Sequence, residues 1–402
     1  MVNKKVLEIS PIYAVLISIF SLYFYCSCLI SRFTYEIILV NKTKTKSNHS
    51  NSYNLMLFKK PFTLIGAVPS PYTRKLVALL RYRRIDYRVI WGDLKKNLDL
   101  MGISPPKVRL LPTCIIEVEE DVSAATCDTT PIIRQLEESF DSRKVIPSDP
   151  VLAFLDYLVE DYADEWCTKF MFHYRWHPEE DAKNAAKLLP ILQEGVSISS
   201  DQHDIYSDYI YDRQVGRLGV VGSNKVTADL IEQSYIRTLR ALDNHLERYS
   251  FIFGSRPSAS DFALYGQLSQ LIGFDPTPRA LAHKFAPRVV SWTSLMEDQC
   301  GIETRDDEWN IDLESPTFKK LLTEIGCFYA PALLANKQAY DNDKKEWSTL
   351  IDRTTWSQNT FSYQAKCLQW IRDEFCKLSD KNKQKVLQVL DGTKCKRLFS
   401  NG

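Results

Sequence analysis

One stretch, residues 62–90, constrains the fold of this chain more than any other. It begins with a short apolar strand, turns at Ser70 and Pro71, continues as a helix with leucines on one face, and ends in a second strand. A β-rich segment at 113–118 with a hairpin return follows, and then an amphipathic helix at 130–140. The order β-α-β-β-β-α predicts a small α/β domain built around one sheet.

Beyond residues 141–150, which interrupt the periodicity and indicate a linker, the pattern is almost wholly helical. Helices are predicted at 151–176, 180–195, 226–249, 259–272, 278–284 and 287–298, and further along at 316–342, 362–378 and 380–391. The stretch 196–223 is ambiguous and indicates a mobile cover. We expect four parts: a leader and tether (1–55), an α/β domain (56–143), an all-helical domain (150–305), and a helical extension packed on it (306–402).

The leader differs in kind from the rest of the chain. Residues 9–30 form an uncharged run of 22 residues, long enough for a helix to span a bilayer. More lysine and arginine follows this run than precedes it, which favours a membrane-anchored protein with its main body in the cytoplasm. In the alternative, the leader is absent and a soluble cytoplasmic chain begins at Met56, directly before the first strand.

Composition excludes one class of partner. Lys and Arg number 51 against 50 Asp and Glu, so the chain lacks the basic footprint of a nucleic-acid-binding protein. The ten cysteines are scattered without a C-x2-C pair, which fits a reducing compartment better than a disulfide scaffold.

A serine, a proline and an aspartate lie at the starts of three predicted elements. Ser70 precedes a helix, where free N–H groups and the macrodipole favour an anion, although Ser is also a common cap there. Pro112 opens a strand, where proline is tolerated. Asp128 precedes the helix at 130–140, where a carboxylate either caps the helix or receives a ligand amine.

Ser258 and Asp261 head a second apolar helix and form a capping box that we expect to be structural. Their segment, FIFGSRPSASDFALYGQL (residues 251–268), and the segment at 62–138 resemble the two halves of a glutathione transferase. The resemblance covers residues 56–402, and the second half is similar to bacterial-type members. It implies an α+β fold: a thioredoxin-like domain, an all-helical domain and a helical extension.

The resemblance also implies a role for each candidate. Ser70 would stabilise the thiolate of glutathione, the co-substrate. The backbone of Leu111 would pair with the cysteinyl group of glutathione, beside a cis bond at Pro112. Asp128 and Thr129 would bind the γ-glutamyl end. The implied reaction is conjugation of the thiolate to a small apolar electrophile, as in detoxification, and a homodimer is a further expectation.

Other interpretations stay open. Tyr72 and Thr73 are alternative hydroxyls for the glutathione sulfur. The fold can also serve a non-catalytic binding or scaffolding protein at a membrane, or a glutathione-dependent isomerase.

The helix at 160–176 is expected to face the electrophile. Tyr162 and Trp166 lie four residues apart and would form an aromatic wall of the acceptor pocket, unless they belong to the domain core.

A metal site is also considered on this helix. His173 and His177 are four residues apart, and Glu179 follows them. Pro178 ends the helix, and the sequence indicates no third ligand, so we predict no metal.

Overall fold

The computed structural model describes residues 61–119 and 122–399. Its strands are β1 (Phe62–Gly66), β2 (Tyr87–Trp91), β3 (Thr113–Glu119), β4 (Val122–Cys127), β5 (Glu346–Ile351) and β6 (Thr354–Asn359). Its helices are α2 (Pro71–Tyr82), α3 (Leu94–Leu100), α4 (Thr129–Ser139), α5 (Pro150–Tyr162), α6 (Thr168–Trp176), α7 (Glu179–Glu194), α8 (Ser200–Val215), α9 (Ala228–Leu246), α10 (Ala259–Gly273), α11 (Pro276–Phe285), α12 (Pro287–Met296), α13 (Pro316–Glu324), α14 (Ala330–Asp341), α15 (Ser362–Lys377) and α16 (Asp380–Val389). Short π and 3-10 segments are η1 (Ala163–Cys167), η2 (Leu218–Val221), η3 (Asp306–Glu308), η4 (Ile325–Tyr329) and η5 (Cys395–Leu398).

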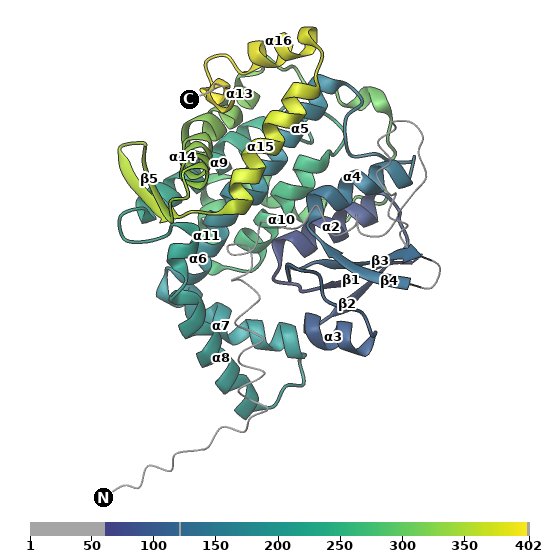
Figure 1. Ribbon diagram of the computed structural model, residues 1–402, viewed down its shortest axis with the longest axis vertical. Coiled ribbons are helices and arrows are strands. Elements are labelled where there is room, and N and C mark those ends of the chain that lie inside the picture. Colours follow the sequence, from purple (N-terminus) through teal and green to yellow (C-terminus); the bar gives the residue numbers. More distant parts are fainter. Residues whose placement is uncertain (1–60, 120–121, 400–402) are drawn as a thin grey trace, which may run out of the picture.

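The first four strands form a mixed sheet in the order β2-β1-β3-β4, seen beside a larger body of helices in Figure 1. β1 pairs parallel with β2 and antiparallel with β3, and β3 pairs antiparallel with β4. The predicted thioredoxin-like α/β arrangement is confirmed, with one added helix, α3. The sequence pattern misses α3 because its buried residues, Leu94 and Leu98, make only one helical repeat.

α2 joins the sheet to the helical body. Leu76, Leu79 and Leu80 are fully buried, and α2 packs closely along α10. At the crossing, a Cβ on Gly266 of α10 would stand 2.5 Å from the carbonyl oxygen of Pro71. Only a residue without a side chain allows the two backbones to approach this closely.

The helical body confirms the predicted helices in outline and resolves the ambiguous stretch. Residues 150–176 form α5, η1 and α6 in succession, with a π turn in the middle. Most of the stretch 196–223 is the helix α8, which packs on α7. α10 is buried along most of its length and begins at a capping box in which Asp261 accepts from the Ser258 backbone N–H at 2.9 Å.

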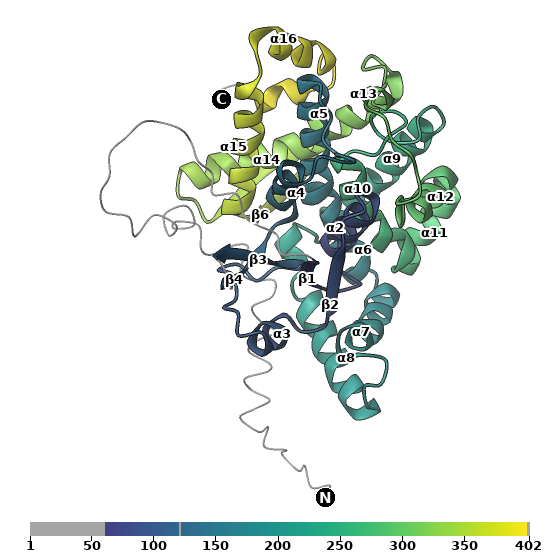
Figure 2. The ribbon, with the colours of Figure 1, turned by 90° about the vertical axis from the view of Figure 1, so that its right-hand side faces the viewer.

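The C-terminal extension is helical except for one hairpin, β5–β6, which the sequence analysis does not predict. Its turn is made by Asp352 and Arg353, both at positive φ (45° and 66°), in place of the Asn or Gly that usually mark such turns. Trp347 of β5 and Trp356 of β6 are buried. Figure 2 shows α15 and α16 beside α5, and both helices contact α5.

The predicted membrane span, residues 9–30, lies outside the described residues. Within residues 61–119 and 122–399, no helix combines the length and apolar character needed to cross a bilayer.

The crossing of α2 and α10 generates a prediction. Gly266→Ala should lower the free energy of unfolding by about 1–3 kcal/mol, because the new methyl group must push two backbones apart. Chemical denaturation measures this change. The matched control is Gly273→Ala at the end of the same helix, where a Cβ meets nothing within 4 Å. Equal stability of the two variants would contradict the close crossing.

Candidate functional site

Ser70 lies at the start of α2, as predicted, and it makes two hydrogen bonds. Its Oγ accepts from the backbone N–H of Thr73 at 3.2 Å, so Ser70 does cap the helix. The same hydroxyl donates to the carbonyl oxygen of Leu111 at 3.4 Å. The fold therefore brings together two candidates that lie 41 residues apart in the sequence.

Leu111 and Pro112 form the approach to β3. The peptide bond between them is cis, and β3 begins at the next residue, Thr113. The partly buried Leu111 presents its carbonyl group to Ser70, and the Thr113 side chain donates to the Leu110 carbonyl at 2.6 Å. The strand entry and the helix start thus face each other.

Buried polar side chains of the helical body hold the loop before Ser70. Arg175 of α6 donates to the carbonyl oxygen of Pro69 at 3.1 Å and to the Asp275 carboxylate at 3.0 Å. Gln270 of α10 donates to the carbonyl oxygen of Val68 at 3.3 Å. These contacts are not predicted from the sequence because more than 100 residues separate Arg175 and Gln270 from the loop.

The two alternative hydroxyls are both engaged elsewhere. Tyr72 donates its hydroxyl to the backbone carbonyl of Asp164 at 2.8 Å, which turns it toward η1. Thr73 is fully buried, and its Oγ1 accepts from the backbone N–H of Ala67 at 3.4 Å. Ser70 and Tyr72 are both partly exposed, but of these three hydroxyls only that of Ser70 donates to Leu111.

Asp128 caps α4 and also receives a side chain from the extension. Its Oδ1 accepts from the backbone N–H of Thr130 at 3.3 Å, and Thr129 is the buried first residue of the helix. Its Oδ2 accepts from the hydroxyl of Tyr363, in α15, at 2.8 Å. Burial raises the pKa of the Asp128 carboxyl, and the hydrogen bond from Tyr363 opposes that rise.

A buried ionic cluster lies directly behind these residues. Lys75 of α2 is fully buried and donates to Glu160 at 2.8 Å and to Asp164 at 2.6 Å. Arg134 of α4 donates to Glu160 at 2.6 Å, and Thr130 donates to the same carboxylate at 3.1 Å. Burial lowers the pKa of Lys75, but the two carboxylates outweigh it and raise the pKa above its ordinary value. The helical pattern of the sequence predicts the buried leucines of α2 but not the burial of Lys75 beside them.

The extension contacts two further acidic side chains of this region. Tyr329 of η4 donates to Asp161, and Gln364 of α15 donates to Glu165 at 3.2 Å. Burial, followed by the negative charge of Asp161, raises the pKa of Glu165 to about 8. Burial likewise raises the pKa of Asp161 to about 7, so both groups bind protons more tightly than surface acids do.

The expected acceptor pocket requires a correction. Tyr162 and Trp166 are fully buried, and neither lines an opening. Tyr162 bonds to Thr238 at 2.8 Å, and the indole N–H of Trp166 donates to Ser234 at 3.1 Å. The ring of Trp166 packs on Trp356 of the extension at 5.3 Å between centroids. The aromatic stripe is core because the extension covers it.

Comparison with known families finds a match within the helical body of the chain. Residues 224–294 match the family model described as glutathione S-transferase, C-terminal domain. No curated protein matches the chain.

Solved structures similar to this chain include a GST-like protein from Pseudomonas syringae (15% identity, TM-score 0.40, 59% of this chain and 67% of that one). A glutathione S-transferase from Rhodospirillum rubrum has 17% identity and a TM-score of 0.35, with 65% of this chain and 92% of that one covered. A glutathione transferase family member from Pseudomonas fluorescens, with two glutathione bound, has 14% identity and a TM-score of 0.34, covering 65% and 92%.

The raised pKa of Glu165 predicts a pH dependence of stability. Its folded pKa of about 8 exceeds the ordinary 4.5, so its contribution is fully present below pH 4.5 and is lost as the pH rises to about 8. Glu165→Gln removes this titration. Relative to the variant, the wild type should lose up to about 1.4 kcal/mol of unfolding free energy per pH unit in that window.

Chemical denaturation across this pH range measures the difference. Glu138→Gln, on the exposed face of α4, is the control and should follow the wild type. Parallel curves for wild type and Glu165→Gln would show that Glu165 does not titrate in this way.

Proposed function

We propose that the chain is a glutathione transferase, on the premise that residues 224–294 match the glutathione S-transferase C-terminal domain, which supports the resemblance to that family. Glutathione is the co-substrate, and its thiolate attacks a small electrophile. The observation that carries the proposal is the hydrogen bond from the hydroxyl of Ser70, at the start of α2, to the backbone carbonyl of Leu111.

Ser70 is proposed to stabilise the thiolate. A hydroxyl at a helix N-terminus can donate to an anion while the nearby backbone N–H groups and the macrodipole add favourable charge. Such stabilisation lowers the pKa of the glutathione thiol and supplies the nucleophile near neutral pH. Glutathione would take the Ser70 hydrogen bond that Leu111 now receives.

The peptide part of glutathione is proposed to lie along Leu111 and Pro112 and to end at Asp128 and Thr129. The Asp128 carboxylate would receive the γ-glutamyl ammonium, and the start of α4 would receive its carboxylate. Because Tyr363 donates to the same Asp128 carboxylate, this hydroxyl competes with the γ-glutamyl ammonium for it.

A second candidate function is a non-catalytic binding or scaffolding protein. The observation that favours it is the extension, which fills the space over Tyr162 and Trp166 and engages Asp128. A glutathione-dependent isomerase would use the same Ser70 without consuming glutathione. The homodimer and a membrane anchor at residues 9–30 remain proposals, and sedimentation of the full-length chain with lipid vesicles tests the anchor.

Ser70→Ala tests the proposed chemistry. The full-length variant should still bind glutathione in calorimetry, but its bound thiolate absorbance near neutral pH should fall. Loss of one charge-assisted hydrogen bond of about 1.5 kcal/mol raises the thiol pKa by about one unit. Ser139→Ala, an exposed serine of α4, is the control. Unchanged thiolate in Ser70→Ala would assign the role to another group, and no glutathione binding by the wild type would favour the scaffold.

Tyr363→Phe tests the contact at the peptide anchor. Removing the competing hydroxyl from Asp128 should tighten glutathione binding about fivefold, the equivalent of one net hydrogen bond of about 1 kcal/mol. Calorimetry measures the change, with Tyr340→Phe, an exposed tyrosine of α14, as the control. Asp128→Ala should abolish binding. Weaker binding by Tyr363→Phe would mean that Tyr363 supports the ligand.

A further inference from the structure

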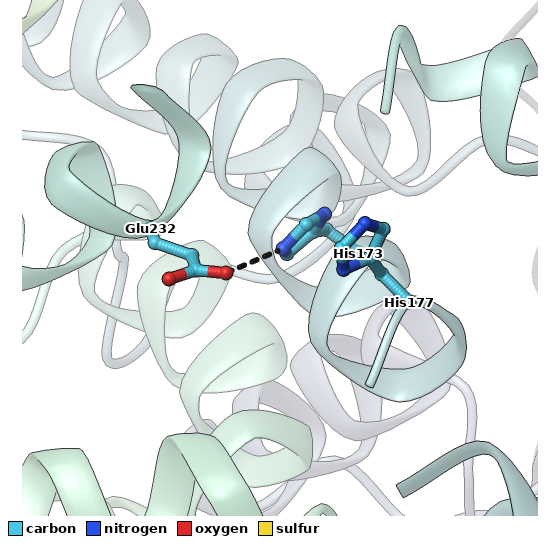
Figure 3. Close-up of side chains that lie close together, drawn as sticks. All are labelled: His173, His177 and Glu232. Carbon is cyan, nitrogen blue, oxygen red and sulfur yellow. Dashed lines mark hydrogen bonds and ion pairs between the residues drawn. The ribbon is translucent and has the colours of Figure 1, made fainter. Parts of the chain in front are cut away.

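Two histidines project from the end of α6 on one face of the helix. His173 lies in its last turn, and His177 follows one turn later as the C-terminal cap, its backbone N–H donating to the His173 carbonyl at 2.7 Å. Their rings stack at 4.5 Å between centroids, with 21° between the ring planes. Figure 3 shows both rings on the same side of this helix end. Two histidines four residues apart are a common way for one helix to present two metal ligands.

A carboxylate from another helix completes the group. Glu232, in the second turn of α9, places its Oε1 3.3 Å from the Nε2 of His173, and Figure 3 shows it facing the histidine pair. One ligand atom from each of the three side chains lies within 4.8 Å of the others, and among the residues that the structure describes this is the one group of three such side chains found. Glu179, which follows the two histidines in the sequence, lies outside this group and pairs with Lys183 on the surface.

Ser223 supplies the outer contact that a metal-binding histidine requires. Its Oγ lies 2.8 Å from the Nδ1 of the fully buried His173. When Nδ1–H donates to this oxygen, the lone pair of His173 lies on Nε2 and points toward the Glu232 carboxylate. Two acceptors that face each other in this way attract a cation between them, and such an outer hydrogen bond orients a metal-binding imidazole.

Charge and access also fit a cation. Asp229, one turn before Glu232 on α9, adds negative charge beside the group. His177 and Glu232 are both partly exposed, so an ion can enter from solvent and both side chains can adjust. Zn²⁺ bonds to nitrogen and oxygen are about 2.0–2.2 Å long. For an ion to bind, the His177 ring must therefore rotate away from its stack on His173, and the Glu232 carboxylate must move toward the ion.

We propose that His173, His177 and Glu232 form a binding site for a divalent transition-metal ion of the Zn²⁺ class. Two imidazole nitrogens and one carboxylate oxygen are the ligand types that such ions prefer, and three protein ligands leave one position for water. The ion joins the end of α6 to α9. Since α6 also carries Arg175, which holds the loop before Ser70, the metal stabilises the helix that supports that loop. The site does not depend on the proposed glutathione chemistry.

The test is titration of the chelator-treated full-length protein with Zn²⁺ in a calorimeter and with Co²⁺ in an absorption spectrometer. We expect one ion per chain and a visible Co²⁺ spectrum of nitrogen and oxygen ligands. His177→Ala should weaken binding at least about tenfold, and Ser223→Ala by about 10- to 100-fold through loss of the outer contact. His283→Ala, an exposed histidine of α11, should bind as the wild type does.

A second readout separates loss of the site from loss of the fold. Because a ligand of the folded state stabilises it, a fixed Zn²⁺ concentration should raise the unfolding temperature of the wild type and of His283→Ala more than that of His177→Ala. Three results would overturn the proposal: no binding by the wild type, unchanged binding by His177→Ala, or a Co²⁺–thiolate charge-transfer band, which would assign the ion to cysteines.

Discussion

The ammonium group of Lys75 links the sheet region to the helical body. It lies in the interior between the carboxylates of Glu160 and Asp164, and Arg134 binds the far side of Glu160. Ions are removed from water here at a considerable desolvation penalty, so the arrangement is stable only with every partner present. Because Lys75 lies in α2, this cluster sets where α2 starts and therefore where Ser70 stands.

The candidate site depends on contacts from four directions. The cluster positions α2 and α4 from behind, Arg175 and Gln270 hold the preceding loop, and Leu111 faces Ser70 from the strand entry. The extension adds the hydroxyl of Tyr363, which donates to Asp128. The last part of the chain thus borders the proposed peptide anchor at Asp128.

Much of the fold follows from local pattern, and the long-range contacts do not. The strand–turn–helix at residues 62–90 and the capping box at Ser258 are encoded by near neighbours, so the sequence predicts them. Tyr363 reaches Asp128 across 235 residues, and no local signal marks that pairing. Tyr162 and Trp166 show the same limit, because helical spacing identifies an aromatic stripe but not the element that covers it. The β5–β6 hairpin is missed because its turn uses Asp352 and Arg353.

The packing of Trp356 on Trp166 has a consequence for how the protein is made. Trp356 follows Trp166 by 190 residues, so at about 5–20 residues per second a ribosome needs roughly 10–40 s to supply the partner ring. During that interval Trp166 lacks the ring of Trp356 that packs on it. A nascent chain of this kind is exposed to aggregation until its C-terminus emerges, and premature termination leaves an unfinished core rather than a smaller working protein.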